Sequence, residues 1–106
     1  MTPGTSEHKA QVCQDLIKTY HENIWKDEMY LLQLEQVKGD KRKEIAALDL
    51  KLEAKGFKTK NEGEKAKFVA ERELAQIEQE IKAVTEKVQS IWPARIQLVN
   101  EYLENK

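Results

Sequence analysis

The chain contains 106 residues, which is enough for one small domain. Charged residues make up 35% of the sequence and aromatic residues 7%, with only four glycines and two prolines, a composition typical of long helices rather than of a sheet. The net charge is −1, which argues against an acidic DNA mimic and against a strongly basic nucleic-acid binder.

The cysteine content and the hydropathy pattern indicate the cellular compartment in which the protein is expected. Cys13 is the only cysteine, so no internal disulfide can form, as is usual in a reducing compartment. The first nine residues lack the charged-then-apolar pattern of a secretory signal. No apolar run approaches the ~20 residues that a membrane-spanning helix needs. We therefore expect a soluble, cytoplasmic protein with a single domain over residues 1–106.

The first predicted helix spans about residues 7–55 and follows a short loose tail. Its apolar residues recur every seven positions in two series, which is the spacing of a coiled-coil seam. These residues are Ile17, Ile24, Leu31, Leu34, Ile45, Leu48 and Leu52. The helix is expected to end where Gly56 takes the left-handed conformation and places Phe57 near Leu52.

Polar residues interrupt this seam. Asp27, Lys38 and Lys41 occupy positions where the heptad pattern favours an apolar residue. Gly39 and Asp40 are poor helix formers, and the glycine costs about 1 kcal/mol relative to alanine. Three interpretations of residues 38–43 stay open: a continuous exposed helix, a bend, or a break.

A turn over residues 56–60 leads to a second helix, predicted over about residues 61–104. Asn61 is the expected N-cap, with Glu64 as its reciprocal partner. The heptad seam comprises Ala70, Leu74, Ile77, Ile81, Val84, Val88 and Ile91. Pro93 predicts a kink or a break near Trp92. Beyond it the apolar stripe restarts one residue out of step, a shift that a four-residue insertion in the heptad would produce.

Folding the chain at residues 57–59 aligns the two helices. It brings Leu34 near Ile81 and Ile24 near Trp92, and the two arms match in length and pattern. The predicted fold class is therefore all-α, an antiparallel helical hairpin of the coiled-coil type.

The half of the hairpin nearest the termini carries more apolar surface than one seam can bury. We expect this surface to form a homodimer, with a four-helix bundle as its core. A compact three-helix monomer bent at Gly39 is the alternative, and the same side chains also suit a core or a foreign partner protein. The candidate interface residues are Trp25, Met29, Tyr30, Leu32, Trp92 and Val99.

No pattern in the sequence points to a catalytic, metal or cofactor site. His8, Cys13 and His21 do not share one helical face, and no metal-binding pair spacing is present. The glycines stand alone, so no phosphate-binding loop is predicted, and no nucleophile motif occurs. We therefore expect a non-enzymatic structural or protein-interaction module without a cofactor.

The segment from residue 38 to residue 67 is basic. It contains ten Lys or Arg and six Asp or Glu, a net charge of +4. Positioned positive charge suffices to bind phosphates, so a nucleic-acid accessory protein is the alternative function. The candidate contacts are Lys41, Arg42, Lys43, Lys58 and Lys60.

The turn also carries a resemblance. Residues 56–65 read Gly-Phe-Lys-Thr-Lys-Asn-Glu-Gly-Glu-Lys. A Lys-Asn-Glu-x-Glu-Lys turn that opens a long charged helix resembles small coiled-coil proteins of uncharacterised role that bacteriophages and prophages encode. The likeness covers about twenty residues around the turn. It implies a bacterial cytoplasm and a role beside phage DNA metabolism or assembly, and it transfers no catalytic residue.

Overall fold

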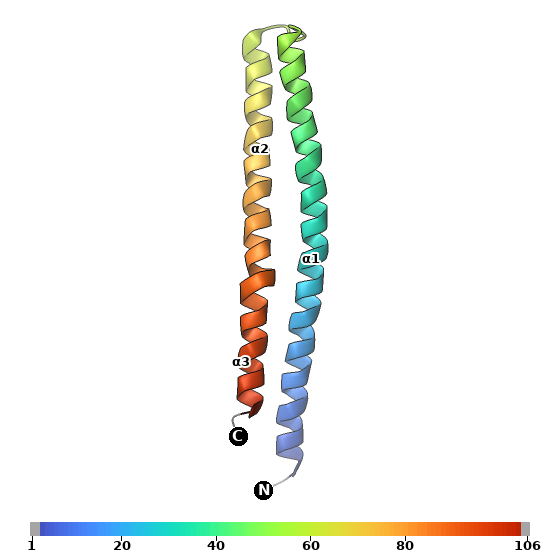
Figure 1. Ribbon diagram of the computed structural model, residues 1–106, viewed down its shortest axis with the longest axis vertical. Coiled ribbons are helices and arrows are strands. Elements are labelled where there is room, and N and C mark those ends of the chain that lie inside the picture. The colour runs from blue at the N-terminus through green and yellow to red at the C-terminus, as the bar shows by residue number, and fades with distance from the viewer. Residues whose placement is uncertain (1–2, 105–106) are drawn as a thin grey trace. The chain divides into compact units, whose positions relative to one another are not determined.

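The computed structural model is all-α, and it describes the backbone of residues 3–104 and the side chains of residues 7–104. The elements are α1 (Pro3–Glu53), α2 (Lys60–Glu86), a π-helical turn η1 (Lys87–Ile91) and α3 (Trp92–Glu104) (Figure 1). The predicted fold class, an antiparallel helical hairpin, is confirmed. The first helix begins at Pro3, earlier than predicted, so most of the expected loose tail is helical.

The chain divides into two compact units. Unit 1 comprises Met1–Tyr30 and Val84–Lys106, and unit 2 comprises Leu31–Ala83. In unit 2, Lys41 contacts Glu73 while Asp49 contacts Lys67, so the two helices run antiparallel in the predicted register. In unit 1 the start of α1 lies against the end of α3, with Lys9 over the ring of Tyr102. The single domain over residues 1–106 stays a prediction.

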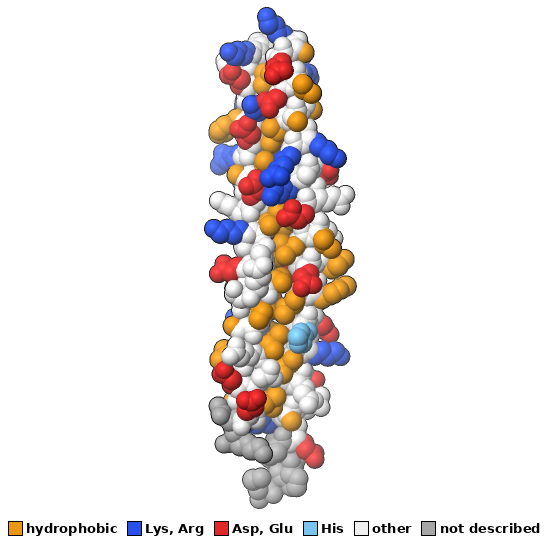
Figure 2. Space-filling model, in the orientation of Figure 1, with side chains coloured by type: hydrophobic (Ala, Val, Ile, Leu, Met, Phe, Trp, Pro, Cys, Tyr) orange, Lys and Arg blue, Asp and Glu red, His pale blue; other side chains and the backbone are white. Residues whose placement is uncertain are grey.

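A thin apolar seam holds each unit together. Among the described residues, the buried apolar side chains are Cys13 and Val84 in unit 1 and Leu34 and Ala70 in unit 2. Half-buried residues continue the seam at three- and four-residue spacing, as the heptad pattern predicts. Figure 2 shows hydrophobic side chains along the line between the helices and charged side chains outside it.

Helix α1 continues through Gly39 and Asp40 without a break. A broken helix and a three-helix monomer are therefore wrong for this chain. The reason is physical: one glycine costs about 1 kcal/mol, whereas Leu34 and Ile45 on either side pack into the same seam of unit 2. A Cβ atom at Gly39 would meet nothing within 4 Å, so packing within the chain does not require a glycine there.

The end of α1 differs from the prediction by one residue. Lys55 takes the left-handed conformation, with φ of 58°, and Gly56 has no positive φ. The amide of Gly56 donates to the carbonyl of Lys51 at 2.9 Å, and that of Lys55 donates to Leu52 at 3.1 Å. These are the two bonds of a Schellman motif with Lys55 at its left-handed position. The predicted role of Gly56 is therefore wrong.

The start of α2 also differs. Thr59, not Asn61, is the N-cap, because its Oγ1 accepts the amide hydrogen of Glu62 at 3.1 Å. Thr59 and Glu62 have the spacing of a capping box. Gly63 is buried in the first turn, and a Cβ there would lie 2.6 Å from Cδ2 of Phe57 and would also overlap Leu52. This glycine therefore allows the turn to close against the helix.

Of the two alternatives predicted near Trp92, a kink or a break, the break is wrong, because the π-helical turn η1 continues directly into α3. The amide of Trp92 donates to the carbonyl of Lys87, five residues back, and α3 follows directly. A π turn adds one residue to the helix, which moves the following seam residues by one position. Ile96, Val99 and Leu103 are accordingly half-buried. The widened turn also relieves the crowding that Pro93 imposes on the preceding turn.

Candidate functional site

Helix α1 carries three large apolar side chains on the side turned away from its seam. Trp25, Met29 and Leu32 are spaced i, i+4 and i+7, which places them on one helical face. Their exposed fractions are 62%, 44% and 65%. We call these three residues the outer stripe. Trp25 and Met29 belong to unit 1 and Leu32 to unit 2, and all three belong to the same helix, α1.

Other exposed apolar side chains occur in both units. Tyr30 and Val37 lie on α1 beside the seam and are 40% and 46% exposed. Sequence analysis did not include the following residues in the candidate interface, although each is an exposed apolar residue: Val12, Leu16, Val37, Leu50, Phe68, Val69, Ile91, Leu98 and Tyr102. Whether such a residue is exposed depends on which face of its helix packs against the other helix. The residue composition of a segment does not show which face that is.

Trp92 is half-buried in unit 1 and is held there by contacts within the chain. Its Nε1 donates a hydrogen bond to Oδ2 of Asp27 at 2.7 Å, and its ring stacks on Tyr20 with 5.8 Å between centroids. The guanidinium of Arg95 lies 5.7 Å from the Trp92 ring. Asp27 thus has a structural reason to occupy a seam position. Of the six predicted interface residues, Trp25, Met29, Tyr30 and Leu32 are exposed, whereas Trp92 and Val99 are half-buried.

Lys41 is the corresponding polar residue in the seam of unit 2. Its Nζ lies 2.8 Å from Glu44 and 3.3 Å from Glu73, and its side chain is only 16% exposed. The hydrogen bond that Lys41 donates to Glu44, together with the one that it donates to Glu73, raises the pKa of Lys41 above its ordinary value of 10.5. The lysine therefore bridges α1 and α2, and it is not presented to a ligand.

Two further basic residues of the segment lie beside carboxylates. Lys67 contacts Asp49 at 2.6 Å and Glu71 at 3.8 Å, and the hydrogen bond that Lys67 donates to Asp49 raises the pKa of Lys67. Lys60 lies 3.9 Å from Glu64. Among the predicted nucleic-acid contacts, Arg42, Lys43 and Lys58 are exposed residues for which the described part of the chain shows no ion pair.

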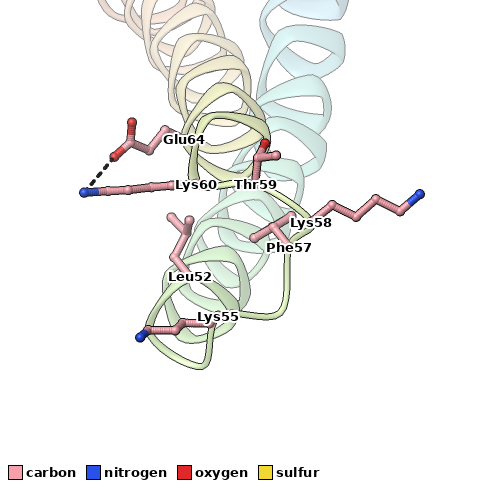
Figure 3. A pocket seen from close by; sticks show the side chains of 7 residues that line it. All are labelled: Leu52, Lys55, Phe57, Lys58, Thr59, Lys60 and Glu64. Atoms are coloured by element: carbon pink, nitrogen blue, oxygen red, sulfur yellow. Dashed lines mark ion pairs between the residues drawn. The ribbon is translucent and has the colours of Figure 1, made fainter.

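An open pocket of about 510 Å³ lies at the turn (Figure 3). It is lined by Leu52, Lys55, Phe57, Lys58, Thr59, Lys60 and Glu64. The hydroxyl of Thr59 already caps α2, and the ammonium of Lys60 is directed toward Glu64. The ammonium groups of Lys55 and Lys58 diverge in Figure 3. The pocket therefore lacks the convergent polar groups that orient a small ligand.

Two further properties concern the described residues as a set. No group of three or more His, Cys, Asp or Glu within them is arranged to hold a metal ion. None of their helices combines the length and the apolar character needed to cross a bilayer.

No known protein-family model, curated protein or solved structure matches the chain. The resemblance of the turn to phage-encoded coiled-coil proteins therefore stays a prediction. The cytoplasmic location and the absence of enzymatic activity stay predictions as well.

Proposed function

We propose that this protein is a non-enzymatic interaction module that self-associates through the outer stripe of α1. The observation that carries the proposal is the exposure of Trp25 and Leu32, at 62% and 65%, with Met29 between them on the same face. Aromatic residues and Met are enriched in the centres of protein interfaces, and Trp is enriched among the residues that contribute most to binding.

Burial within the chain is not available to these side chains. The seam of α1 faces the second helical segment in each unit, and the outer stripe lies on the other side of α1. Fully burying one large apolar side chain is worth about 1.5–3 kcal/mol, so covering both copies of the stripe supplies much of the free energy of a stable dimer. A second copy of the chain provides a matching stripe without any other component.

The alternative, binding of nucleic acid at the basic segment, receives less support. Lys41 is held in the seam by two carboxylates, and Lys60 lies beside Glu64. Three exposed basic residues are left from the predicted set, which is few for a sequence-independent phosphate contact. A role beside phage assembly is compatible with the proposed module and rests on the resemblance of the turn alone.

Light scattering coupled to size exclusion tests the proposal. The wild-type chain has a mass of 12.3 kDa and is expected to elute at twice that value. The double variant Trp25→Glu/Leu32→Glu is expected to elute as a monomer with unchanged helicity. Phe68→Glu is the matched control, because Phe68 on α2 is 63% exposed and lies outside the stripe. A monomeric wild-type chain, or an unchanged mass for the double variant, overturns the proposal.

A further inference from the structure

We propose that the pocket at the turn binds an acidic segment of a partner protein, which places one large apolar side chain in the pocket and its carboxylates on the lysines around it. The pocket has a volume of about 510 Å³, and its lining residues lie between Leu52 and Glu64, all within unit 2. This volume falls in the range of roughly 300–1,000 Å³ that is usual for ligand sites. The inference goes beyond the proposed self-association, because the outer stripe contributes no residue to the lining of the pocket.

The floor of the pocket is apolar and is fixed by packing. It consists of Leu52 at the end of α1 and Phe57 in the turn, both half-buried. Both side chains lie against α2 at Gly63, since a Cβ atom there would overlap Leu52 and would lie 2.6 Å from Cδ2 of Phe57. The two side chains are thus held in place within unit 2, so the apolar floor is formed before a ligand binds.

Three lysines surround this floor. Lys55, Lys58 and Lys60 line the pocket and are exposed. Within the described part of the chain, Lys55 and Lys58 make no ion pair, whereas Lys60 makes one with Glu64 at 3.9 Å and stays 86% exposed. Three ammonium groups therefore accompany one carboxylate at the pocket, and the surplus of positive charge complements an acidic partner.

The directions of the three lysines select the shape of the partner. In Figure 3, Lys58 extends to one side of the pocket, whereas Lys55 and Lys60 extend to the other side, and the apolar floor lies between them. A small anion can reach the ammonium groups on one side alone. An extended segment with carboxylates on both sides of a large apolar residue reaches both sides while that residue covers the floor. The pocket therefore fits an acidic peptide segment better than a small molecule.

The backbone of Lys55 gives an independent argument for this site. Lys55 has a φ of 58°, and among the described residues no other non-glycine residue has a positive φ. Glycine takes this conformation without the steric cost that a Cβ atom brings, and it is favoured at this position of a Schellman motif. Strained residues of this kind cluster at active sites and ligand-binding segments. A lysine here gives the pocket an ammonium group that a glycine would not supply.

Nucleic acid fits the pocket less well. Proteins that bind single-stranded nucleic acid combine positive charge with aromatic rings on which the bases stack. Phe57 is the one aromatic residue in the lining, and Nζ of Lys51 lies 4.5 Å from the centroid of its ring. The ring is also half-buried and packs on Gly63, so it is a poor platform for a base.

Fluorescence anisotropy with a labelled synthetic peptide tests the inference. The probe has two glutamates on each side of one tryptophan, and it is expected to bind the wild-type chain. Replacing its tryptophan by serine, or its glutamates by glutamines, should raise the dissociation constant about tenfold. Lys58→Gln should have a similar effect. Lys82→Gln is the matched control, because Lys82 is an exposed lysine of α2 outside the pocket, and it should leave binding unchanged.

Lys55→Gly separates a role in binding from a structural role. This variant is expected to raise the melting temperature, because it removes the strain, and at the same time to weaken peptide binding about tenfold. Loss of binding through unfolding would lower the melting temperature instead. The double variant Trp25→Glu/Leu32→Glu should bind the peptide with the wild-type affinity, so this inference and the proposed self-association can fail separately.

Three results would overturn the inference. They are the absence of peptide binding at millimolar concentration, equal binding by Lys58→Gln and Lys82→Gln, and wild-type affinity in Lys55→Gly. Tighter binding of a single-stranded oligothymidine than of the peptide, lost in Lys58→Gln, would assign the pocket to nucleic acid and would also overturn it.

Discussion

Gly39 in α1 and Gly63 in α2 predict opposite responses to one substitution. Replacing a helical glycine by alanine adds about 0.5–1 kcal/mol to the free energy of unfolding, because the unfolded chain loses conformational freedom and the helix gains a better former. At Gly39 nothing opposes this gain, since the new Cβ meets no atom within 4 Å. Gly39→Ala should therefore stabilise the fold.

At Gly63 the same methyl group has no room. It would lie 2.6 Å from Cδ2 and 3.0 Å from Cε2 of Phe57, and it would also overlap Leu52. Overpacking of this kind costs about 1–3 kcal/mol, which exceeds the gain in helix propensity. We expect Gly63→Ala to lower the free energy of unfolding by about 1 kcal/mol, so that the two variants differ by about 2 kcal/mol.

Urea denaturation followed by circular dichroism measures this difference. The protein concentration should lie below the dimer dissociation constant, so that changes at Gly39 report on the fold and not on association. On thermal melting, a difference of about 2 kcal/mol corresponds to roughly 8 °C for a chain of this size. Equal stabilities of the two variants, or a more stable Gly63→Ala variant, would refute the account of the turn.

Three further predictions concern the caps and the polar seam. Lys55→Gly should stabilise the fold by about 1 kcal/mol in thermal melts, because a residue with a Cβ now occupies the left-handed position; no gain would contradict the Schellman assignment. Asp27→Ala should cost about 1–3 kcal/mol in urea titrations by removing the acceptor of the Trp92 indole, whereas Asp27→Asn should keep most of that stability. The raised pKa values of Lys41 and Lys67 predict stability that is complete below pH 10.5 and lost as pH rises further, and titration of stability into alkali should show a smaller loss in Lys41→Met/Lys67→Met.

The heptad spacing was sufficient to predict the helical hairpin and its register. The series that includes Ile17, Ile24 and Leu31 identifies one face of α1, and equal arm lengths identify the turn. The polar seam residues were recognised as exceptions, but their partners were not. Asp27 receives the indole hydrogen of Trp92 across the seam, and a contact 65 residues apart in sequence follows only once the register is known.

The details of the turn were less predictable. The spacing of Thr59 and Glu62 was available as a capping signal, but Asn61 and Glu64 offer the same spacing two residues later. Lys55 in the left-handed conformation goes against residue preference, since glycine is favoured at that position. The backbone hydrogen bonds from Gly56 to Lys51 and from Lys55 to Leu52 place Lys55 at the left-handed position instead. Tertiary closure at Gly63 thus overrides the local signals.

The one-residue shift of the apolar stripe at Pro93 could be predicted from the sequence. The structural cause of that shift could not. A one-residue displacement of the seam is compatible with a break, with an insertion of four residues, and with a π turn. The structure has the π turn, which keeps the helix continuous and lets Trp92 enter the seam. Trp25, Met29 and Leu32 were already candidates from the sequence, and the structure adds that they are exposed whereas Trp92 and Val99 are half-buried.

The mass of the wild-type chain across a range of concentrations tests the central claim most directly. If the outer stripe of α1 pairs two copies, sedimentation equilibrium should show a reversible transition from 12.3 kDa at low concentration to twice that mass at high concentration. A constant mass of 12.3 kDa up to millimolar concentration would contradict the account, because the exposed Trp25, Met29 and Leu32 would then have no partner in a second copy of the chain.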